Sequence, residues 1–192
     1  MHPVIALGDH KAYMAYALSL ARLSPPKPTN FCVGCVIINH FTGAILSTGY
    51  TLELEGNTHA EQCAIAKLLL DAGMPVTRGG EWEPSYESDL VRGFVEEGVV
   101  ISVYTTMEPC AKRGSGNRSC VKRLLGLREV LRKVYVGVRE PEIFVGENKG
   151  RARLEREGVR VVEVKGLEEE ILEVARAGHV KEEGTEEGEG TV

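Results

Sequence analysis

The chain has no long apolar run. None of its 192 residues lies in a stretch close to the ~20 consecutive apolar residues that a transmembrane helix needs. The N-terminal segment is interrupted by Asp9, His10 and Lys11, so it lacks the uniform apolar block of a signal peptide. The five cysteines are odd in number and sparse, which indicates thiols or metal ligands and not a disulfide framework. We therefore expect a cytoplasmic protein with no membrane partner.

The chain also lacks a basic excess. Its net charge is −5, and the last twelve residues, KEEGTEEGEGTV, account for −4 of it through five Glu and one Lys. The remaining −1 is spread over 180 residues, whereas nucleic-acid-binding surfaces are normally basic. We expect no nucleic-acid partner, although a small basic pocket for one phosphate is compatible with this balance. The length predicts a single domain, 1–177, followed by an acidic Glu/Gly-rich tail, 178–192.

Apolar periodicity and turn residues predict strands that alternate with helices after an initial hairpin. Residues 75–98 are expected to be irregular, with a short helix possible at 90–96. Further helices are predicted at about 10–23, 59–71, 119–127, 148–157 and 167–177. Strands are predicted at 32–39, 44–50, 99–105, 134–138 and 159–164. This order favours an α/β layered domain whose mixed sheet is covered on both faces.

Three short segments carry the side chains that zinc prefers: His59-Ala60-Glu61, Pro109-Cys110 and Cys120. One imidazole and two thiolates leave the fourth tetrahedral position for water, which is the arrangement of a catalytic site. Residues 59 and 61 are about 200° apart around a helix, so they address one site only at a helix N-terminus. Both His59 and Cys120 lie at the start of a predicted helix, where thiolates and a bound hydroxide are favoured. Glu61 is then free to act as a proton shuttle.

Each of these residues alone has an ordinary structural explanation. A histidine at a helix start is usually a cap or a surface residue, and a lone cysteine is usually a small core residue. Together, however, they match the zinc-deaminase signature H-x-E…P-C-x-x-C. The chain departs from that signature because nine residues, and not two, separate Cys110 from Cys120. We expect Cys32, Cys35 and Cys63 to be core residues.

The segments NFCVGCVIIN at 30–39, THAEQCA at 58–64 and TTMEPCAKRGSGNRSC at 105–120 resemble the zinc-dependent, cytidine-deaminase-like enzymes of riboflavin biosynthesis. The enlarged loop before the second cysteine is most similar to that of the fungal members. The resemblance covers roughly 30–165. It implies a three-layer α/β/α cytidine-deaminase-like fold with a central mixed sheet of about five strands, a zinc cofactor and a homodimer. It also implies hydrolysis of 2,5-diamino-6-ribitylamino-4(3H)-pyrimidinone 5'-phosphate to 5-amino-6-ribitylamino-2,4(1H,3H)-pyrimidinedione 5'-phosphate and ammonia.

The resemblance also assigns the site residues. It makes Glu61 catalytic and His59, Cys110 and Cys120 the metal ligands. Asn30 matches an asparagine that contacts substrate in this superfamily, and Glu140 and Glu142 lie where bacterial relatives carry a polar segment near the ribityl chain. The loop before Cys120 combines cations with backbone amides and suits a phosphate. The remaining substrate-binding candidates are Ala60, Lys112, Arg113, Ser115, Gly116, Asn117 and Arg118.

Three other readings remain open. One is a nucleotide or tRNA adenosine deaminase, which the long loop and the near-neutral charge disfavour. Another is a non-catalytic deaminase-like subunit, which would have no use for Glu61. The third is a structural zinc module, which needs a fourth protein ligand that is not evident near Cys120. We expect a stand-alone deaminase or a deaminase domain, without a fused reductase or pseudouridine synthase. Trp82 is expected to line a pocket or to close a dimer contact.

Overall fold

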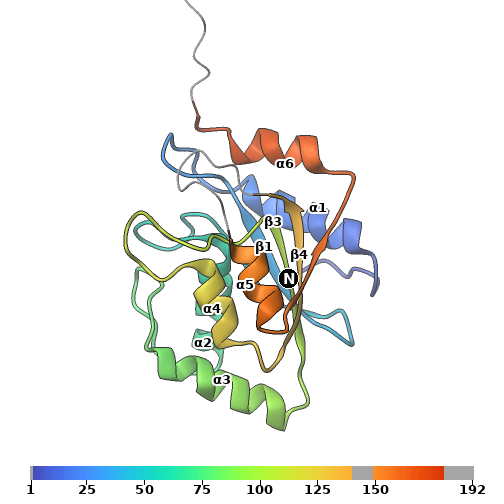
Figure 1. Ribbon diagram of the computed structural model, residues 1–192, viewed down its shortest axis with the longest axis vertical. Coiled ribbons are helices and arrows are strands. Elements are labelled where there is room, and N and C mark those ends of the chain that lie inside the picture. The colour runs from blue at the N-terminus through green and yellow to red at the C-terminus, as the bar shows by residue number, and fades with distance from the viewer. Residues whose placement is uncertain (1, 140–148, 180–192) are drawn as a thin grey trace, which may run out of the picture.

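The computed structural model describes residues 2–139 and 149–179. Figure 1 shows the helices and strands of these residues gathered in one body. The strands are β1 (Gly34–Asn39), β2 (Ile45–Tyr50), β3 (Ile101–Met107), β4 (Leu131–Val138) and β5 (Arg160–Glu163). The helices are α1 (His10–Ala21), α2 (Ala60–Asp71), α3 (Pro84–Glu96), α4 (Cys120–Gly126), α5 (Gly150–Arg156) and α6 (Glu168–Ala175). No helix in these two ranges is long and apolar enough to cross a membrane.

The strands form one mixed sheet in the order β2-β1-β3-β4-β5. β1 is antiparallel to both β2 and β3, while β3, β4 and β5 are parallel. The central strand β3 is buried along its whole length, as expected for a strand that is covered on both faces. The expected mixed five-stranded sheet is confirmed.

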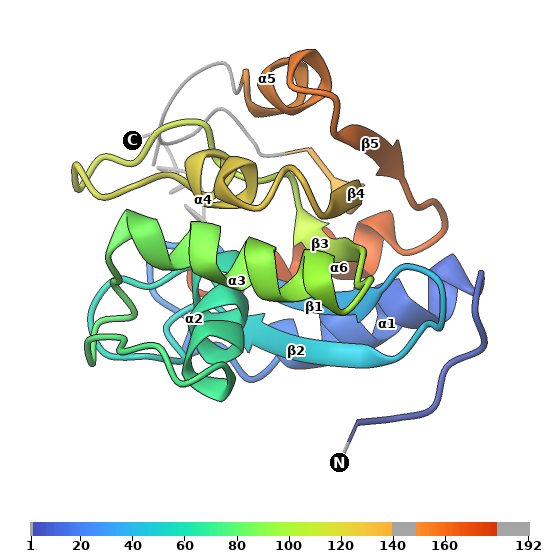
Figure 2. The ribbon, with the colours of Figure 1, turned by 90° about the horizontal axis from the view of Figure 1, so that it is seen from below.

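Alternation along the strands separates two apolar cores. Cys35 and Ile37 of β1 face a core that α2, α3, α4 and α5 cover, whereas Val36 and Ile38 face a core that α1 and α6 cover. The fold is therefore the three-layer α/β/α arrangement that the resemblance implies. Figure 2 shows α3 running alongside α2 and α4, and it packs against both.

Helix α3 is longer than the sequence pattern predicts. It occupies Pro84–Glu96, so the short helix expected at 90–96 extends backward by two turns through a segment expected to be irregular. Pro84 lies in the first turn, where a missing N–H costs no hydrogen bond. Leu90 and Val91 lie three and four residues after Glu87, so the three buried side chains share one face of the helix. Because Glu87 carries a carboxylate at one of these buried positions, the sequence pattern does not reveal the apolar face of this helix.

A close approach between β2 and α2 fixes where α2 begins. A Cβ on Gly49 would lie 2.2 Å from the carbonyl oxygen of Ala60 and 2.6 Å from the amide nitrogen of Ala64. The hydroxyl of Ser47, two residues earlier on the same strand, donates to the carbonyl oxygen of Ala64 at 2.8 Å. The strand therefore presses directly on the first turns of α2 and holds its N-terminus in place.

Gly49→Ala is expected to destabilise the protein by about 2 kcal/mol, because the added methyl group forces β2 and α2 apart. Urea-induced unfolding followed by circular dichroism measures this change. Gly93→Ala is the matched control, since Gly93 lies within α3 and has no heavy atom within 4 Å of an added Cβ. That control should raise stability by about 0.5–1 kcal/mol. Equal losses in the two variants would contradict the packing argument.

Candidate zinc centre and active site

The N-terminus of α2 presents an imidazole and a carboxylate to one place. His59 is the N-cap residue in an extended conformation, and its side chain makes no capping hydrogen bond. Its ring is therefore available to a ligand. Glu61 lies in the first turn and is only 3% exposed. Because β2 packs against α2 at Gly49, the start of α2 places the side chains of His59 and Glu61 at one site. The spacing of His59 and Glu61 in the sequence predicts this arrangement.

Two cysteines reach the same place from other elements. Cys110 follows the end of β3, and Cys120 is the first residue of α4. The Nδ1 atom of His59 lies 3.6 Å from Sγ of Cys110 and 3.4 Å from Sγ of Cys120, and all three ligand atoms lie within 4.8 Å of one another. A tetrahedral zinc ion with ordinary Zn–S and Zn–N bonds separates S and N by about 3.6 Å. The three side chains therefore fit zinc.

The cluster has the composition of an open metal site. In the part of the chain that the structure describes, His59, Cys110 and Cys120 are its only members. A structural zinc site normally has four protein ligands, whereas a catalytic one has three and leaves a position for water. The arrangement therefore disfavours the structural zinc module.

The two thiols differ in acidity because they share one hydrogen bond. The hydrogen bond from Cys120 and the nearby His59 ring lower the pKa of Cys110 to about 4, against the opposing effect of burial. The backbone N–H of Cys120 also donates to Sγ of Cys110, at 3.4 Å. The same shared hydrogen bond, followed by burial, raises the pKa of Cys120. Since zinc binds thiolates, metal binding releases the remaining thiol proton.

Glu61 is held in a dry environment beside these ligands. Oγ1 of Thr105 lies 3.1 Å from Oε1 of Glu61 and 3.0 Å from the carbonyl oxygen of Met107. A hydroxyl group has one hydrogen, so Thr105 can donate to only one of these two acceptors at a time. Burial, and then the neighbouring Cys110, raises the pKa of Glu61. A carboxyl group with a raised pKa is suited to taking up and returning a proton near neutral pH.

A cavity of about 220 Å³ opens over this cluster, and His59, Glu61 and Cys110 line it. Both side-chain polar atoms of Asn30 are buried, and neither has a hydrogen-bond partner among the residues that the structure describes. A buried amide without partners costs free energy unless a ligand satisfies it, and Asn30 lines this cavity. Five of the predicted substrate-binding residues line the cavity: Asn30, Ala60, Lys112, Arg113 and Ser115.

Other predicted residues lie beside the cavity or outside the described residues. Arg118 forms an ion pair with Glu87, with Nη1 2.8 Å from Oε1, and does not line the cavity. Gly116 and Asn117 follow in the same loop and are not among the residues that line the cavity. Glu140 and Glu142 lie outside the described residues, as does the acidic tail from residue 180 onward.

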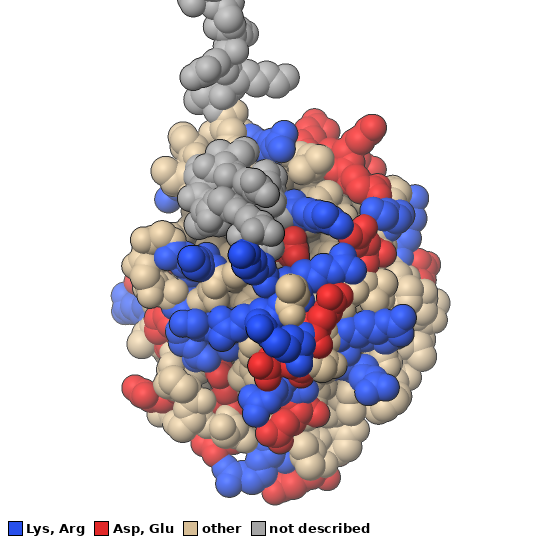
Figure 3. Space-filling model, viewed as in Figure 1, with Lys and Arg blue, Asp and Glu red and all other residues tan. Residues whose placement is uncertain are grey.

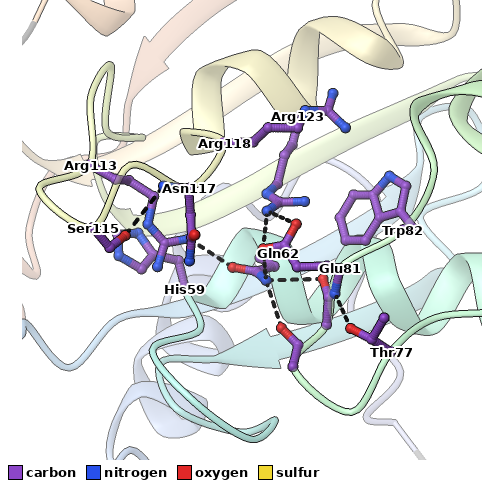
Figure 4. Close-up of polar contacts among 12 residues, drawn as sticks. His59, Gln62, Thr77, Glu81, Trp82, Arg113, Ser115, Asn117, Arg118 and Arg123 are labelled. Atoms are coloured by element: carbon purple, nitrogen blue, oxygen red, sulfur yellow. Dashed lines mark hydrogen bonds and ion pairs between the residues drawn. The ribbon is translucent and has the colours of Figure 1, made fainter.

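Sequence reasoning missed a polar network behind the loop, which Figure 4 shows. Trp82 is 7% exposed and is not among the residues that line this cavity; its Nε1 donates to Oε1 of Glu87 at 2.9 Å. The guanidinium carbon of Arg123 lies 4.5 Å from the centroid of the Trp82 ring. Gln62 and Glu81 join this network to the loop. The only signal in the sequence was a polar residue, Gln62, within the apolar stretch of α2.

Cys110→Ala and Cys120→Ala are each expected to reduce bound zinc far below the one ion per chain expected of the unmodified protein, because each removes a ligand. Metal analysis by mass spectrometry after dialysis measures the zinc content. Cys63→Ala is the matched control, since Cys63 is buried in α2 but belongs to no ligand cluster among the residues with assigned structure. Full zinc content in Cys110→Ala, or an equal loss in Cys63→Ala, would contradict the ligand assignment.

Comparison with known proteins agrees with this geometry. The family described as the cytidine and deoxycytidylate deaminase zinc-binding region matches residues 7–138. A Rib2 deaminase structure from Aspergillus oryzae, a C-terminal deletion mutant, is 40% identical, with 88% of this chain and 92% of that chain aligned at a TM-score of 0.75. The same deaminase in complex with DARIPP is 38% identical, with coverage of 88% and 91% and a TM-score of 0.70.

A longer relative is also known. The diaminohydroxyphosphoribosylamino-pyrimidine deaminase of Schizosaccharomyces pombe is 35% identical over 171 residues, which are 89% of this chain. The chain spans 36% of the length of that relative. The ligand geometry, the family match over residues 7–138 and the Rib2 similarity agree, and the chain belongs to the cytidine and deoxycytidylate deaminase zinc-binding family.

Proposed function

We propose that the chain is a zinc-dependent aminohydrolase of riboflavin biosynthesis. Its substrate is 2,5-diamino-6-ribitylamino-4(3H)-pyrimidinone 5'-phosphate, and its products are 5-amino-6-ribitylamino-2,4(1H,3H)-pyrimidinedione 5'-phosphate and ammonia. The observation that carries this proposal is the meeting of three zinc ligands and the buried Glu61 at one cavity. The similarity to Rib2 deaminase over 92% of its chain supports the choice of substrate.

The residues of the cavity divide the chemistry among them. His59, Cys110 and Cys120 would hold the metal. Zinc, when bound, lowers the pKa of a coordinated water towards ~7. Glu61 accepts a proton from the attacking water, delivers it to a ring nitrogen and then assists protonation of the departing amine. The water oxygen replaces the 2-amino group, and ammonia leaves.

The cavity walls supply groups for the rest of the substrate. The amide of Asn30, which has no partner in the described part of the chain, would contact the pyrimidine or the ribityl chain. The backbone at Ala60 borders the same space. Lys112, Arg113 and Ser115 provide two cations and a hydroxyl group for the phosphate.

The other predicted residues keep supporting roles in this proposal. Gly116 and Asn117 shape the loop that carries the phosphate contacts, and Arg118 holds its far end to α3 through Glu87. Glu140 and Glu142 remain proposed neighbours of the ribityl chain.

We further propose that the domain 1–177 works in the cytoplasm as a homodimer without a nucleic-acid partner. Figure 3 shows acidic side chains interspersed with basic ones on the face viewed in Figure 1. The basic side chains gather across the middle of this face, but residues 1–180 carry a net charge of only −1, whereas nucleic-acid binding normally requires a basic excess. Light scattering of the purified protein tests the dimer.

Glu61→Gln is expected to lower kcat for ammonia release from this substrate by about 10²–10⁴-fold, because the proton shuttle is lost. The variant should retain its zinc, since Glu61 is not a ligand. Glu53→Gln is the matched control: Glu53 pairs with Lys67 at 2.6 Å and does not line the cavity. Ammonia release that survives Glu61→Gln, or that falls equally in Glu53→Gln, would overturn the assigned role.

A further inference from the structure

The guanidinium group of Arg113 is oriented from behind. Its Nη1 donates to Oε1 of Gln62 at 2.8 Å, and its Nη2 donates to the backbone carbonyl of Asn57. Its Nε is buried and has no hydrogen-bond partner among the described residues. Arg113 also lines the cavity. Hydrogen bonds from two of its three nitrogens therefore fix its position beside the cavity.

The amide of Gln62 is itself fixed. Its side chain is fully buried, and Nε2 lies 2.9 Å from the carbonyl oxygen of Gly80 and 3.0 Å from Oε1 of Glu81. It also lies 3.1 Å from the carbonyl oxygen of Gly79. These groups only accept hydrogen bonds, so the nitrogen must face them and the oxygen must face Arg113. The contacts therefore determine the orientation of the amide.

Segment Thr77–Trp82 holds those acceptors in place. The backbone N–H groups of Thr77 and Gly80 donate to the carbonyl oxygens of Glu81 and Thr77, both at 2.9 Å. Oγ1 of Thr77 accepts from the backbone N–H of Glu81 at 3.0 Å. These bonds close a tight turn beneath Gln62, so the segment acts as one rigid support.

A buried cation anchors this support. Arg123 is fully buried, and its Nη2 lies 2.6 Å and 2.7 Å from the two carboxylate oxygens of Glu81. A buried charge must be paired, so Arg123 binds Glu81 tightly while the Trp82 ring covers its guanidinium group. Figure 4 shows the resulting chain of contacts from Arg123 through Glu81 and Gln62 to Arg113.

The charges of the network favour an anion in the cavity. The network contains three guanidinium groups, those of Arg113, Arg118 and Arg123, and two carboxylates, Glu87 paired with Arg118 and Glu81 paired with Arg123. The excess is one positive charge, and Arg113 is the member of the network that lines the cavity. A free arginine side chain loses rotamer entropy when a ligand immobilises it. An arginine that is already held loses less and binds the anion more tightly.

We propose that Gln62 is a positioning residue for the substrate phosphate: its amide oxygen orients Arg113, and Thr77–Trp82 together with Arg123 holds that amide. The role rests on the proposed function, because the anion is the phosphate of the pyrimidinone substrate. Glu61 and Gln62 are adjacent and therefore about 100° apart around α2. One turn of α2 therefore positions Glu61, the proton shuttle, and also positions Arg113, the phosphate contact, through Gln62.

Gln62→Met keeps the side-chain size and removes the amide. Its KM for the phosphorylated substrate is expected to rise about tenfold, because a hydrogen bond to a charged group is lost. Its kcat should change much less, and its KM for the dephosphorylated substrate should stay the same. A purely structural role would instead alter both substrates alike, and that result would overturn the proposal.

A double-mutant cycle tests whether Gln62 acts through Arg113. In the Arg113→Ala background, Gln62→Met should have no further effect on KM. In the Arg92→Ala background the tenfold effect should persist, because Arg92 is an exposed residue of α3 that pairs with Asp89 and does not line the cavity. Independent effects of Gln62→Met and Arg113→Ala would overturn the coupling.

Calorimetric binding of the product, with and without its phosphate, provides a measurement that does not depend on turnover. The preference for the phosphorylated product should fall about tenfold in Gln62→Met. If the unmodified protein releases no ammonia, the proposed function fails. An unchanged phosphate preference in product binding overturns the role of Gln62 separately.

Zinc content and thermal unfolding establish whether Gln62→Met folds. If it does not, Gln62→Asn is the second variant, because it keeps a buried amide but withdraws it from Arg113 by one methylene group. It should show the same phosphate-selective loss in product binding. Retention of the full phosphate preference in Gln62→Asn would overturn the proposal.

Discussion

The first turn of α2 is the constraint on which the rest of the site depends. Because β2 approaches α2 without a side chain at Gly49, the helix begins at a fixed place against the sheet. From that place His59 points towards two thiols, Glu61 points into a buried corner beside Thr105, and Gln62 points towards Arg113 in the loop between Cys110 and Cys120. A shift of this turn would displace all three side chains together.

The support of the loop between Cys110 and Cys120 depends on a buried charge. Placing Arg123 in the interior is unfavourable unless a carboxylate meets it, so the chain brings Glu81 to it from a segment more than forty residues away. This pairing ties the region before α3 to α4. The turn beneath Gln62 and the ion pair between Arg118 and Glu87 then hold the loop between Cys110 and Cys120 at both ends. An enlarged loop needs such support if its cations are to meet a ligand in one geometry.

The sequence predicted the parts that local pattern determines. Period-two and helical periodicity gave the five strands and most helices, and the H-x-E and Pro-Cys motifs gave three ligands that the structure brings within 4.8 Å of one another. The full length of α3 was missed because Glu87 interrupts its apolar face. The contacts of Gln62 with Gly80 and Arg113, and of Trp82 with Arg123, were missed because these partners are distant in sequence. The pairing of His10 with the Tyr104 hydroxyl, at 2.7 Å, is hidden for the same reason.

The most direct test is the ratio of kcat/KM values for ammonia release by the zinc-loaded protein. The substrates compared are the ribityl pyrimidinone 5'-phosphate, dCMP and adenosine in tRNA. Since the cavity offers polar groups that only a matching substrate satisfies, the account predicts a preference of at least about a hundredfold for the ribityl phosphate. Equal or faster release from dCMP or tRNA would contradict it.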